Sequence, residues 1–232
     1  FVYGTEQVEG AYDVCVTCPG ISEFSGFFKA GREHAAQIMG EPEFAYRLSP
    51  DNWIAITGTN GKTTTTSLTD YLLKAAGEAS VAVGNIGEPP VNEIDGRAHN
   101  EWFVAELSSY QIATTTELHP RVAVLLNITP DHLDRHKTLE NYIAIKESIT
   151  KNQDENDFCV LNYNDPVLRE FGKTPRCKVI FFSSSEKLES GVFLRGDTMI
   201  IKENGVETPV CTTKDTSLVG MHNYENIMAA IA

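Results

Sequence analysis

Residues 53–66 read WIAITGTNGKTTTT, and this stretch decides the fold. A short apolar, β-prone run leads into a tight turn that contains Gly58 and Gly61, and Lys62 and four threonines follow. This order is typical of a phosphate-binding loop, in which backbone N–H groups and the positive end of a helix hold phosphate oxygens. Lys62 would lie against the outer phosphates, and the hydroxyl of Thr63 would bind a magnesium ion.

The loop is shorter than the common form. The common pattern has a glycine six residues before the lysine, and here that position is Ile56. The alternative interpretation is a glycine-rich turn that begins a helix and binds nothing. The sequence favours phosphate binding, because strand, glycines, Lys-Thr and helical pattern follow one another in the expected order.

Composition limits the classes of partner. The chain has 232 residues, of which 41% are hydrophobic, enough for one large domain or for one domain and part of another. A net charge of −13 argues against a nucleic acid or an anionic membrane as partner. No apolar run approaches the roughly 20 residues that span a bilayer, and no signal peptide is visible. We therefore expect a cytoplasmic monomer whose five cysteines are reduced.

The remaining pattern predicts an α/β fold. Strands are expected over residues 12–17, 53–56, 80–83, 102–106, 121–127, 158–161 and 179–182, and a hairpin or meander over 192–210. Helices are expected over 27–39, 62–76, 138–151 and 222–232. This alternation predicts a doubly wound, mostly parallel sheet that carries the phosphate loop.

A polar, proline-containing joint at residues 48–52 predicts a domain boundary. Residues 1–47 would be the C-terminal part of a Rossmann-like N-terminal domain, and 48–232 a central nucleotide-binding domain. Because residue 1 is Phe and the first unit is so short, we expect the chain to be a fragment.

Polar residues follow several of the predicted strands. Ligands of such a sheet bind beyond the carboxyl ends of the strands, so Asn85, Glu106 and Asn127 should converge with the phosphate loop on one crevice. Glu106 suits magnesium, although an ordinary surface glutamate is the alternative. His132 lies among acidic residues that could equally form a solvated turn. Composition alone makes Lys146 an ordinary solvated helix lysine.

Six sequence features occur together in one order. They are GTNGKTT (58–64), GNIG (84–87), ELSSYQ (106–111), LNITPDHLDRH (126–136), Lys146 and GMHNYEN (220–226). Together they resemble the Mur ligases of bacterial cell-wall synthesis, and the resemblance covers nearly the whole chain. The GNIG, ELSSYQ and HNYEN motifs favour the branch that adds D-glutamate to UDP-N-acetylmuramoyl-L-alanine.

The resemblance implies a three-domain, ATP-dependent ligase. The N-terminal domain would hold the UDP part of the substrate, the central domain ATP, and the C-terminal domain D-glutamate. Only the end of the first domain and most of the second match this chain, so we expect the third to be absent and the fragment to be inactive alone. In the family reaction the substrate carboxylate attacks the γ-phosphorus of ATP, and the amine of D-glutamate then displaces phosphate from the acyl phosphate.

The resemblance also assigns roles to the nucleotide and metal site. The catalytic residues would be Lys62, His132 and Lys146, with Lys146 converted by carbon dioxide into a carbamate. Two magnesium ions would be held by Thr63, Glu106, His132 and the carbamate of Lys146. The ATP-binding residues would be Gly58, Thr59, Asn60, Gly61, Lys62, Thr63 and Thr64 around the phosphates, and Asn223 and Asn226 at the adenine.

The muramoyl-alanine part of the substrate would contact Asn85, Ser108 and Gln111. The turn Cys18-Pro19-Gly20 occupies the place of a Ser-Pro-Gly turn near the uridine diphosphate. Cysteine in place of serine leaves the hydroxyl contact in doubt, although backbone amides could remain.

Other functions stay open on the sequence. The chain could come from another Mur ligase or from a ligase like folylpolyglutamate synthase, or it could be a nucleotide-binding module only. A regulatory switch that binds guanine nucleotides would need a motif such as NKxD, which this sequence lacks.

Overall fold

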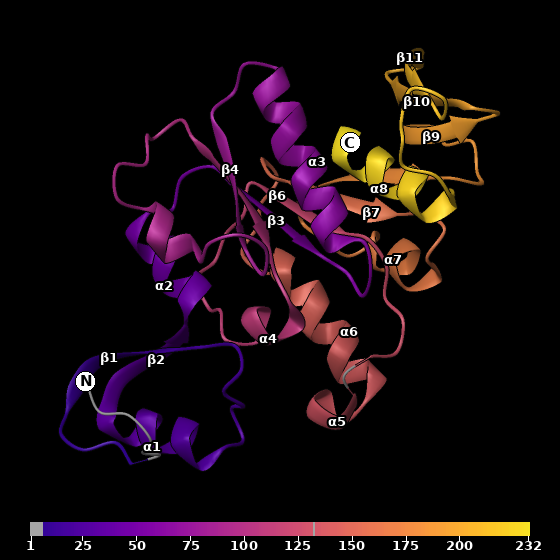
Figure 1. Cartoon of the computed structure of the whole chain (residues 1–232). Coiled ribbons are helices and arrows are strands. Elements are labelled where there is room, and N and C mark those ends of the chain that lie inside the picture. The colour runs from indigo at the N-terminus through magenta and orange to yellow at the C-terminus, as the bar shows by residue number, and fades with distance from the viewer. Residues whose placement is uncertain (1–6, 132) are drawn as a thin grey trace.

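The computed structural model describes residues 7–131 and 133–232, which form two sheets (Figure 1). The smaller sheet pairs β1 (Tyr12–Thr17) in parallel with β2 (Ala35–Gly40), and α1 (Gly26–His34) connects them. The larger sheet has nine strands in the order β11-β10-β9-β8-β7-β6-β3-β5-β4.

The nine strands of the larger sheet are mostly parallel. They are β3 (Trp53–Thr57), β4 (Ser80–Gly84), β5 (Trp102–Glu106), β6 (Val122–Leu125), β7 (Phe158–Asn162), β8 (Lys178–Ser183), β9 (Gly191–Arg195), β10 (Thr198–Glu203) and β11 (Val206–Thr212). All neighbours from β4 to β9 pair in parallel, whereas β10 pairs antiparallel with β9 and with β11. The predicted α/β class, the parallel sheet and the terminal meander are therefore confirmed.

Helices cover both faces of this sheet, because alternate residues of a strand point to opposite faces. On β3, Ile54 and Ile56 belong to one buried cluster, whereas Trp53 and Ala55 belong to the other. The first cluster lies under α3 (Lys62–Ala75) and α8 (Met221–Ile231), which pack side by side in Figure 1. The second lies under α4 (Ser109–Ile112), α6 (Leu139–Glu147) and α7 (Pro166–Phe171).

Short helices complete the chain. These are α5 (Leu133–His136) and the 3₁₀ turns η1 (Pro90–Glu93) and η2 (Ser148–Thr150), the second of which continues the predicted 138–151 helix beyond α6. Across residues 7–131 and 133–232, no helix combines the length and the apolar character that crossing a membrane requires.

The predicted helix over residues 27–39 is wrong in its second half. Ser25 caps α1 by accepting a hydrogen bond from the N–H of Phe28, but the helix ends at His34. The next residues extend into β2, because β1 offers a complete row of backbone partners, in which Val14 pairs with Gln37. This long-range pairing outweighs the helical spacing of the apolar side chains.

A helix that the sequence did not predict, α2 (Glu41–Leu48), joins the two sheets. The Glu43 carboxylate is fully buried and accepts hydrogen bonds from the N–H groups of Thr116, Glu117 and Leu118. Tyr46 packs edge-on against Trp53 at 5.9 Å between ring centroids. The end of the first predicted unit therefore contacts the larger sheet, while the boundary at residues 48–52 stays a prediction.

Candidate functional site

The carboxyl ends of four central strands converge as the sequence predicts. Glu106 ends β5 with 1% of its surface exposed, and its two carboxylate oxygens accept hydrogen bonds from neighbouring strand ends. Thr63 Oγ1, in the first turn of α3, donates to Oε2 at 2.8 Å, and Asn85 Nδ2, beyond β4, donates to Oε1 at 2.7 Å. Glu106 thus connects the 58–64 segment, which follows β3, to the end of β4.

Asn127 fixes the shape of the 58–64 segment. Its Oδ1 accepts from the N–H of Asn60 at 2.8 Å, and its Nδ2 donates to the carbonyl of Asn60 at 3.0 Å. The backbone carbonyl of Asn127 also accepts from the N–H of Thr59 at 2.9 Å. Asn127 therefore acts as a scaffold, because both ends of its amide are used to hold the loop.

Gly61 makes the turn from this loop into α3. Its φ of +86° lies in the left-handed region that favours glycine, and a Cβ at this position would overlap Oδ1 of Asn226 on α8. In the described structure no side chain caps the N-terminus of α3, and its first turn contains no acidic residue. The free N–H groups and the helix dipole at this end fit an anion such as a phosphate.

Two lysines reach the same loop carbonyl. Lys62 Nζ donates to the carbonyls of Gly58 at 3.1 Å and Thr59 at 2.9 Å. Lys146 Nζ donates to the same Gly58 carbonyl at 2.9 Å and to Thr57 Oγ1 at 3.3 Å. The structure therefore brings together the two lysines that the resemblance assigned to catalysis.

Lys146 is buried, so its interpretation as a solvated lysine is wrong. Only 1% of its surface is exposed, and its ammonium lies 4.8 Å from the centre of the Tyr142 ring. Burial, reinforced by the charge of Lys62 and opposed by Asp131, lowers the pKa of Lys146 to about 7. The lowered pKa favours the neutral amine, which is the nucleophilic form of a lysine side chain.

The donor atoms at this edge suit magnesium. The Thr63 hydroxyl and the Glu106 carboxylate present hard oxygens within hydrogen-bond distance of each other, and such oxygens are the ligands that magnesium prefers. Thr64 follows on α3 and is half-buried. His132, the other predicted metal ligand, lies outside the described residues.

Tyr142 and His136 lie beside this site, although the sequence analysis gave a role to neither. The Tyr142 hydroxyl lies 3.1 Å from Thr59 Oγ1, and the His136 ring packs 5.3 Å from that of Tyr142. His136 Nε2 lies 2.9 Å from Ser109 Oγ. Tyr142 could have been found from its spacing, because it precedes Lys146 by four residues and shares its helix face.

Ser108 and Gln111 form a capping box at the start of α4. The Ser108 N–H and Oγ both donate to Gln111 Oε1 at 2.9 Å, and Ser108 Oγ accepts from the Gln111 N–H at 3.2 Å. Ser108 also lines a cavity of about 40 Å³ at the loop. Its lining comprises Gly58, Thr59, Lys62, Ser108, Ser109, Tyr110, Asp131, Tyr142 and Lys146. The substrate contacts of Ser108 and Gln111 stay predictions.

The Cys18-Pro19-Gly20 turn lies beyond β1 and is fastened by α5. Arg135 donates to the carbonyls of Pro19 at 3.2 Å and Ile21 at 3.3 Å. Cys18 is exposed and has a free thiol. The predicted role of this turn at the uridine diphosphate stays a prediction.

A second cavity, of about 390 Å³, adjoins the 58–64 segment. Its lining comprises Asn60, Gly61, Leu126, Asn127, Phe182, His222, Glu225 and Asn226. Asn226 belongs to this lining, and its contact with adenine stays a prediction. Asn223 is absent from this lining, and its Nδ2 donates to the carbonyl of Val219 at 2.8 Å.

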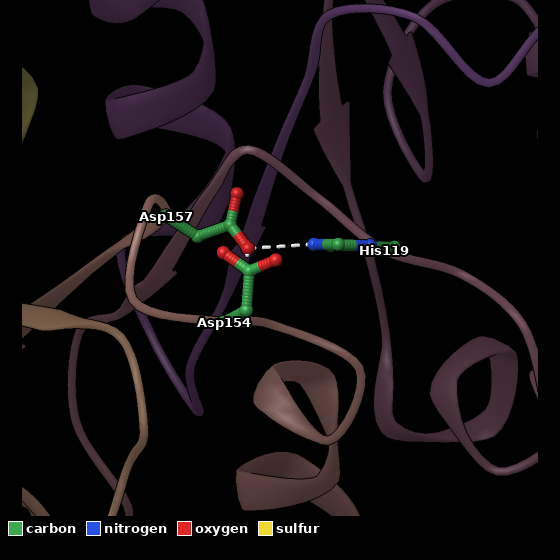
Figure 2. Close-up of side chains that lie close together, drawn as sticks. All are labelled: His119, Asp154 and Asp157. Carbon is green, nitrogen blue, oxygen red and sulfur yellow. Dashed lines mark hydrogen bonds and ion pairs between the residues drawn. The ribbon is translucent and has the colours of Figure 1, made fainter.

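A further cluster of polar side chains lies at the opposite edge of the sheet, before β6 and β7 (Figure 2). His119 Nε2 lies 2.6 Å from Asp157 Oδ2, which also accepts from the N–H of Asp154 at 2.8 Å. Arg121 Nη1 lies 3.4 Å from Asp157 Oδ1. Because Arg121, His119 and the N–H of Asp154 surround the Asp157 carboxylate, we interpret the cluster as a network of hydrogen bonds and an ion pair.

The family model for the Mur ligase middle domain matches residues 56–232, which include the loop, both lysines and Glu106. The chain belongs to the Mur ligase family. It is 42% identical over 225 residues to the UDP-N-acetylmuramoylalanine–D-glutamate ligase of Thermoanaerobacter pseudethanolicus, covering 97% of this chain and 49% of the relative. The ligase of the same name from Lachnoclostridium phytofermentans is 40% identical, with 98% and 50% covered. The chain therefore spans about half the length of these Mur ligases.

Solved structures confirm the Mur ligase fold. The UDP-N-acetylmuramate:L-alanyl-γ-D-glutamyl-meso-diaminopimelate ligase of Neisseria meningitides matches with a TM-score of 0.67 and 20% identity, over 94% of this chain and 72% of that one. The MurF ligase of Thermotoga maritima matches with a TM-score of 0.58 and 21% identity, over 97% and 60%.

Proposed function

We propose that this chain is the ATP-binding part of a ligase that joins D-glutamate to UDP-N-acetylmuramoyl-L-alanine. One observation carries the proposal: the 58–64 segment, a buried Glu106 and a buried Lys146 meet at the carboxyl edge of a parallel sheet. The relatives at 40–42% identity, which bear the name of that ligase, support the choice of substrates.

ATP would place its phosphates on the 58–64 segment. The N–H groups at the start of α3 would bind phosphate oxygens, and Lys62 would exchange its two loop carbonyls for the β- and γ-phosphates. Thr63 and Glu106 would hold magnesium, which supplies positive charge against the repulsion between the phosphates and the incoming carboxylate. Because Asn127 already holds the loop, the backbone N–H groups and Lys62 would meet the phosphates without a change in the contacts of Asn127.

The reaction would proceed in two displacements. A carboxylate oxygen of the muramoyl-alanine substrate forms a bond to the γ-phosphorus, the bond to the β–γ bridging oxygen breaks, and ADP leaves. The amine of D-glutamate then attacks the acyl carbon, inorganic phosphate leaves with the bonding electrons, and the amine loses a proton. Lys62 would stabilise negative charge on the transferring phosphoryl group.

Lys146 would act as a carbamate. Its neutral amine attacks carbon dioxide, a nitrogen–carbon bond forms, and one proton passes to solvent, which leaves an anionic carboxylate-like group. The pKa of about 7 supports this step, because an ordinary lysine, with a pKa near 10.4, is almost fully protonated at neutral pH. The native chain and Lys146→Arg can each be supplied with ¹³CO₂ and compared by ¹³C NMR. A carbamate signal in the native chain alone would support the carbamate on Lys146, and the same signal in both proteins would contradict it.

The chain spans about half the length of the relatives that bear the ligase name. We expect the 232-residue chain to bind ATP but to make no amide by itself, and the complete ligase to work as a cytoplasmic monomer. In the full-length protein, ADP release should require UDP-N-acetylmuramoyl-L-alanine and D-glutamate. Release with folate and glutamate instead would favour a ligase like folylpolyglutamate synthase.

Calorimetric titration of the chain with ATP and magnesium tests the nucleotide site. Lys62→Ala should weaken ATP binding by about 10- to 100-fold, as expected for the loss of one charged phosphate contact. Lys74→Ala is the matched control, because Lys74 lies at the far end of the same helix, paired with Asp70. Equal ATP affinity in Lys62→Ala and in the native chain would refute the loop assignment.

A further inference from the structure

The 390 Å³ cavity beside the loop has two unlike walls. Leu126 and Phe182, both nearly fully buried, form an apolar side that suits the flat face of a base. The polar side comes from α8, with Glu225 and Asn226. Because Gly61 lines both the cavity and the phosphate turn, a nucleotide bound on the loop would place the rest of the molecule here.

Glu225 is held in position by two donors from other elements. Its Oε2 accepts from Asn162 Nδ2 at 3.1 Å, and its Oε1 accepts from Ser184 Oγ at 2.5 Å. Asn162 is itself fixed, because its Nδ2 also donates to the carbonyl of Leu126 and its Oδ1 accepts from the N–H of Asn164. The Glu225 carboxylate is therefore preorganised at the cavity.

A carboxylate held in this way is an acceptor with spare capacity. Its two oxygens offer about four lone-pair sites, and the bonds from Asn162 and Ser184 occupy one on each oxygen. A ligand group facing Glu225 must therefore be a donor. The exocyclic amino group of adenine meets this requirement, whereas the carbonyl oxygen at the same place in hypoxanthine would face the carboxylate with lone pairs on both sides.

We propose that Glu225 makes the cavity selective for adenine by accepting a hydrogen bond from its 6-amino group. The proposal rests on the nucleotide-binding function proposed above and names the residue that would choose the base. Asn226, 5% exposed, packs against Gly61 where α8 meets the loop. Asn223, which bonds to Val219, is not needed for the choice.

A comparison of affinities between nucleotides that differ in one chemical group tests the proposal. Calorimetry with magnesium would compare ATP with purine riboside triphosphate, which lacks the 6-amino group and carries no hydrogen on N1. Inosine and guanosine triphosphates are poorer probes, because their N1–H groups could donate to the carboxylate instead. We expect the native chain to bind ATP about 10- to 100-fold more tightly than purine riboside triphosphate, the range of a hydrogen bond to a charged group.

Variants of Glu225 assign the preference to this residue. Glu225→Ala should lower the ratio of ATP to purine riboside triphosphate affinity toward one, and Glu225→Gln, which keeps the side-chain shape, should lower it in part. Glu203→Ala, which changes an exposed glutamate at the end of β10, should leave the ratio unchanged. The ratio is informative because a general loosening of the fold would weaken both nucleotides equally.

Each outcome is decisive. Equal affinities of the native chain for ATP and purine riboside triphosphate would overturn the role of Glu225 while leaving the nucleotide site standing, and this arm needs no variant to fold. An unchanged ratio in Glu225→Ala would overturn it as well. No binding of either nucleotide would instead refute the proposed function itself.

Discussion

Replacing Glu43 by glutamine should destabilise the protein strongly. The buried carboxylate accepts five hydrogen bonds, from three backbone N–H groups, from Thr116 Oγ1 and from Arg47 Nε. Glutamine can keep the acceptor at Oε1, but its NH₂ group then faces the N–H groups of Thr116 and Leu118, which bond to Oε2. Two buried donors without an acceptor cost about 1–3 kcal/mol each, so we expect a loss of about 2–6 kcal/mol.

Urea unfolding followed by tryptophan fluorescence would measure this loss, because Trp53 is fully buried next to α2. Glu117→Gln is the matched control. Glu117 pairs with the same Arg47, but its side chain is 63% exposed, so its loss should cost no more than about 1 kcal/mol. A free energy of unfolding for Glu43→Gln within about 0.5 kcal/mol of the native value would refute the reasoning.

The same carboxylate predicts a dependence on pH. Burial raises the pKa of Glu43, but hydrogen bonds from Thr116, Glu117 and Arg47 outweigh burial and hold that pKa below its usual value of 4.5. A lowered pKa in the folded state gives stability that is present above pH 4.5 and is lost as pH falls through the folded value. The stability difference between the native chain and Glu43→Gln should therefore shrink below pH 4.5, which urea titrations from pH 7 to pH 3 would show.

Three further predictions concern the site and the opposite edge of the sheet. Magnesium should tighten ATP binding about 10-fold less in Glu106→Gln than in the native chain, because a hard anionic oxygen is lost. Calorimetry with and without the ion would measure this, and an equal effect of magnesium in both proteins would contradict the metal assignment. Gly61→Ala should weaken ATP binding and lower the stability of the fold, because the new Cβ overlaps Asn226. Gly77→Ala is the control, because Gly77 has a similar φ of +91° but open space around it, and it should cost only about 1 kcal/mol of stability in thermal unfolding. A chelator should leave the melting temperature of the chain unchanged if the carboxylate of Asp157 is held by ion pairs, and a fall that zinc restores would show a metal site there.

The central sheet and its loop could be predicted because their signals are local. The 53–66 stretch contains strand, turn and helix start in order, and the apolar run around β6 identifies a buried strand without reference to the rest of the chain. The convergence of Glu106 with Asn85 followed from the general rule that parallel strands present their carboxyl ends at one edge. Neither step required knowledge of a distant contact.

Features that depend on contacts between residues far apart in the sequence could not be predicted. Strand β2 forms because β1 pairs with it, and nothing within residues 35–40 distinguishes that strand from the end of a helix. The burial of Lys146 depends on how α6 packs against the loop after β3, about 88 residues away in sequence.

The position of the β10–β11 hairpin makes it a suitable site for attaching a label. Its turn, Asn204-Gly205, has a φ of +52° and +80°, and Val206 beside it is 65% exposed. In the strand order β10 is five places from β3, and at about 4.8 Å per strand this separates the two strands by roughly 24 Å. The turn also lies at the opposite edge of the sheet from the loop, because Lys202 pairs with Gly191, the first residue of β9. A fluorophore attached there would provide a fixed reference point, far enough away to leave the loop untouched and close enough for energy transfer to a labelled nucleotide.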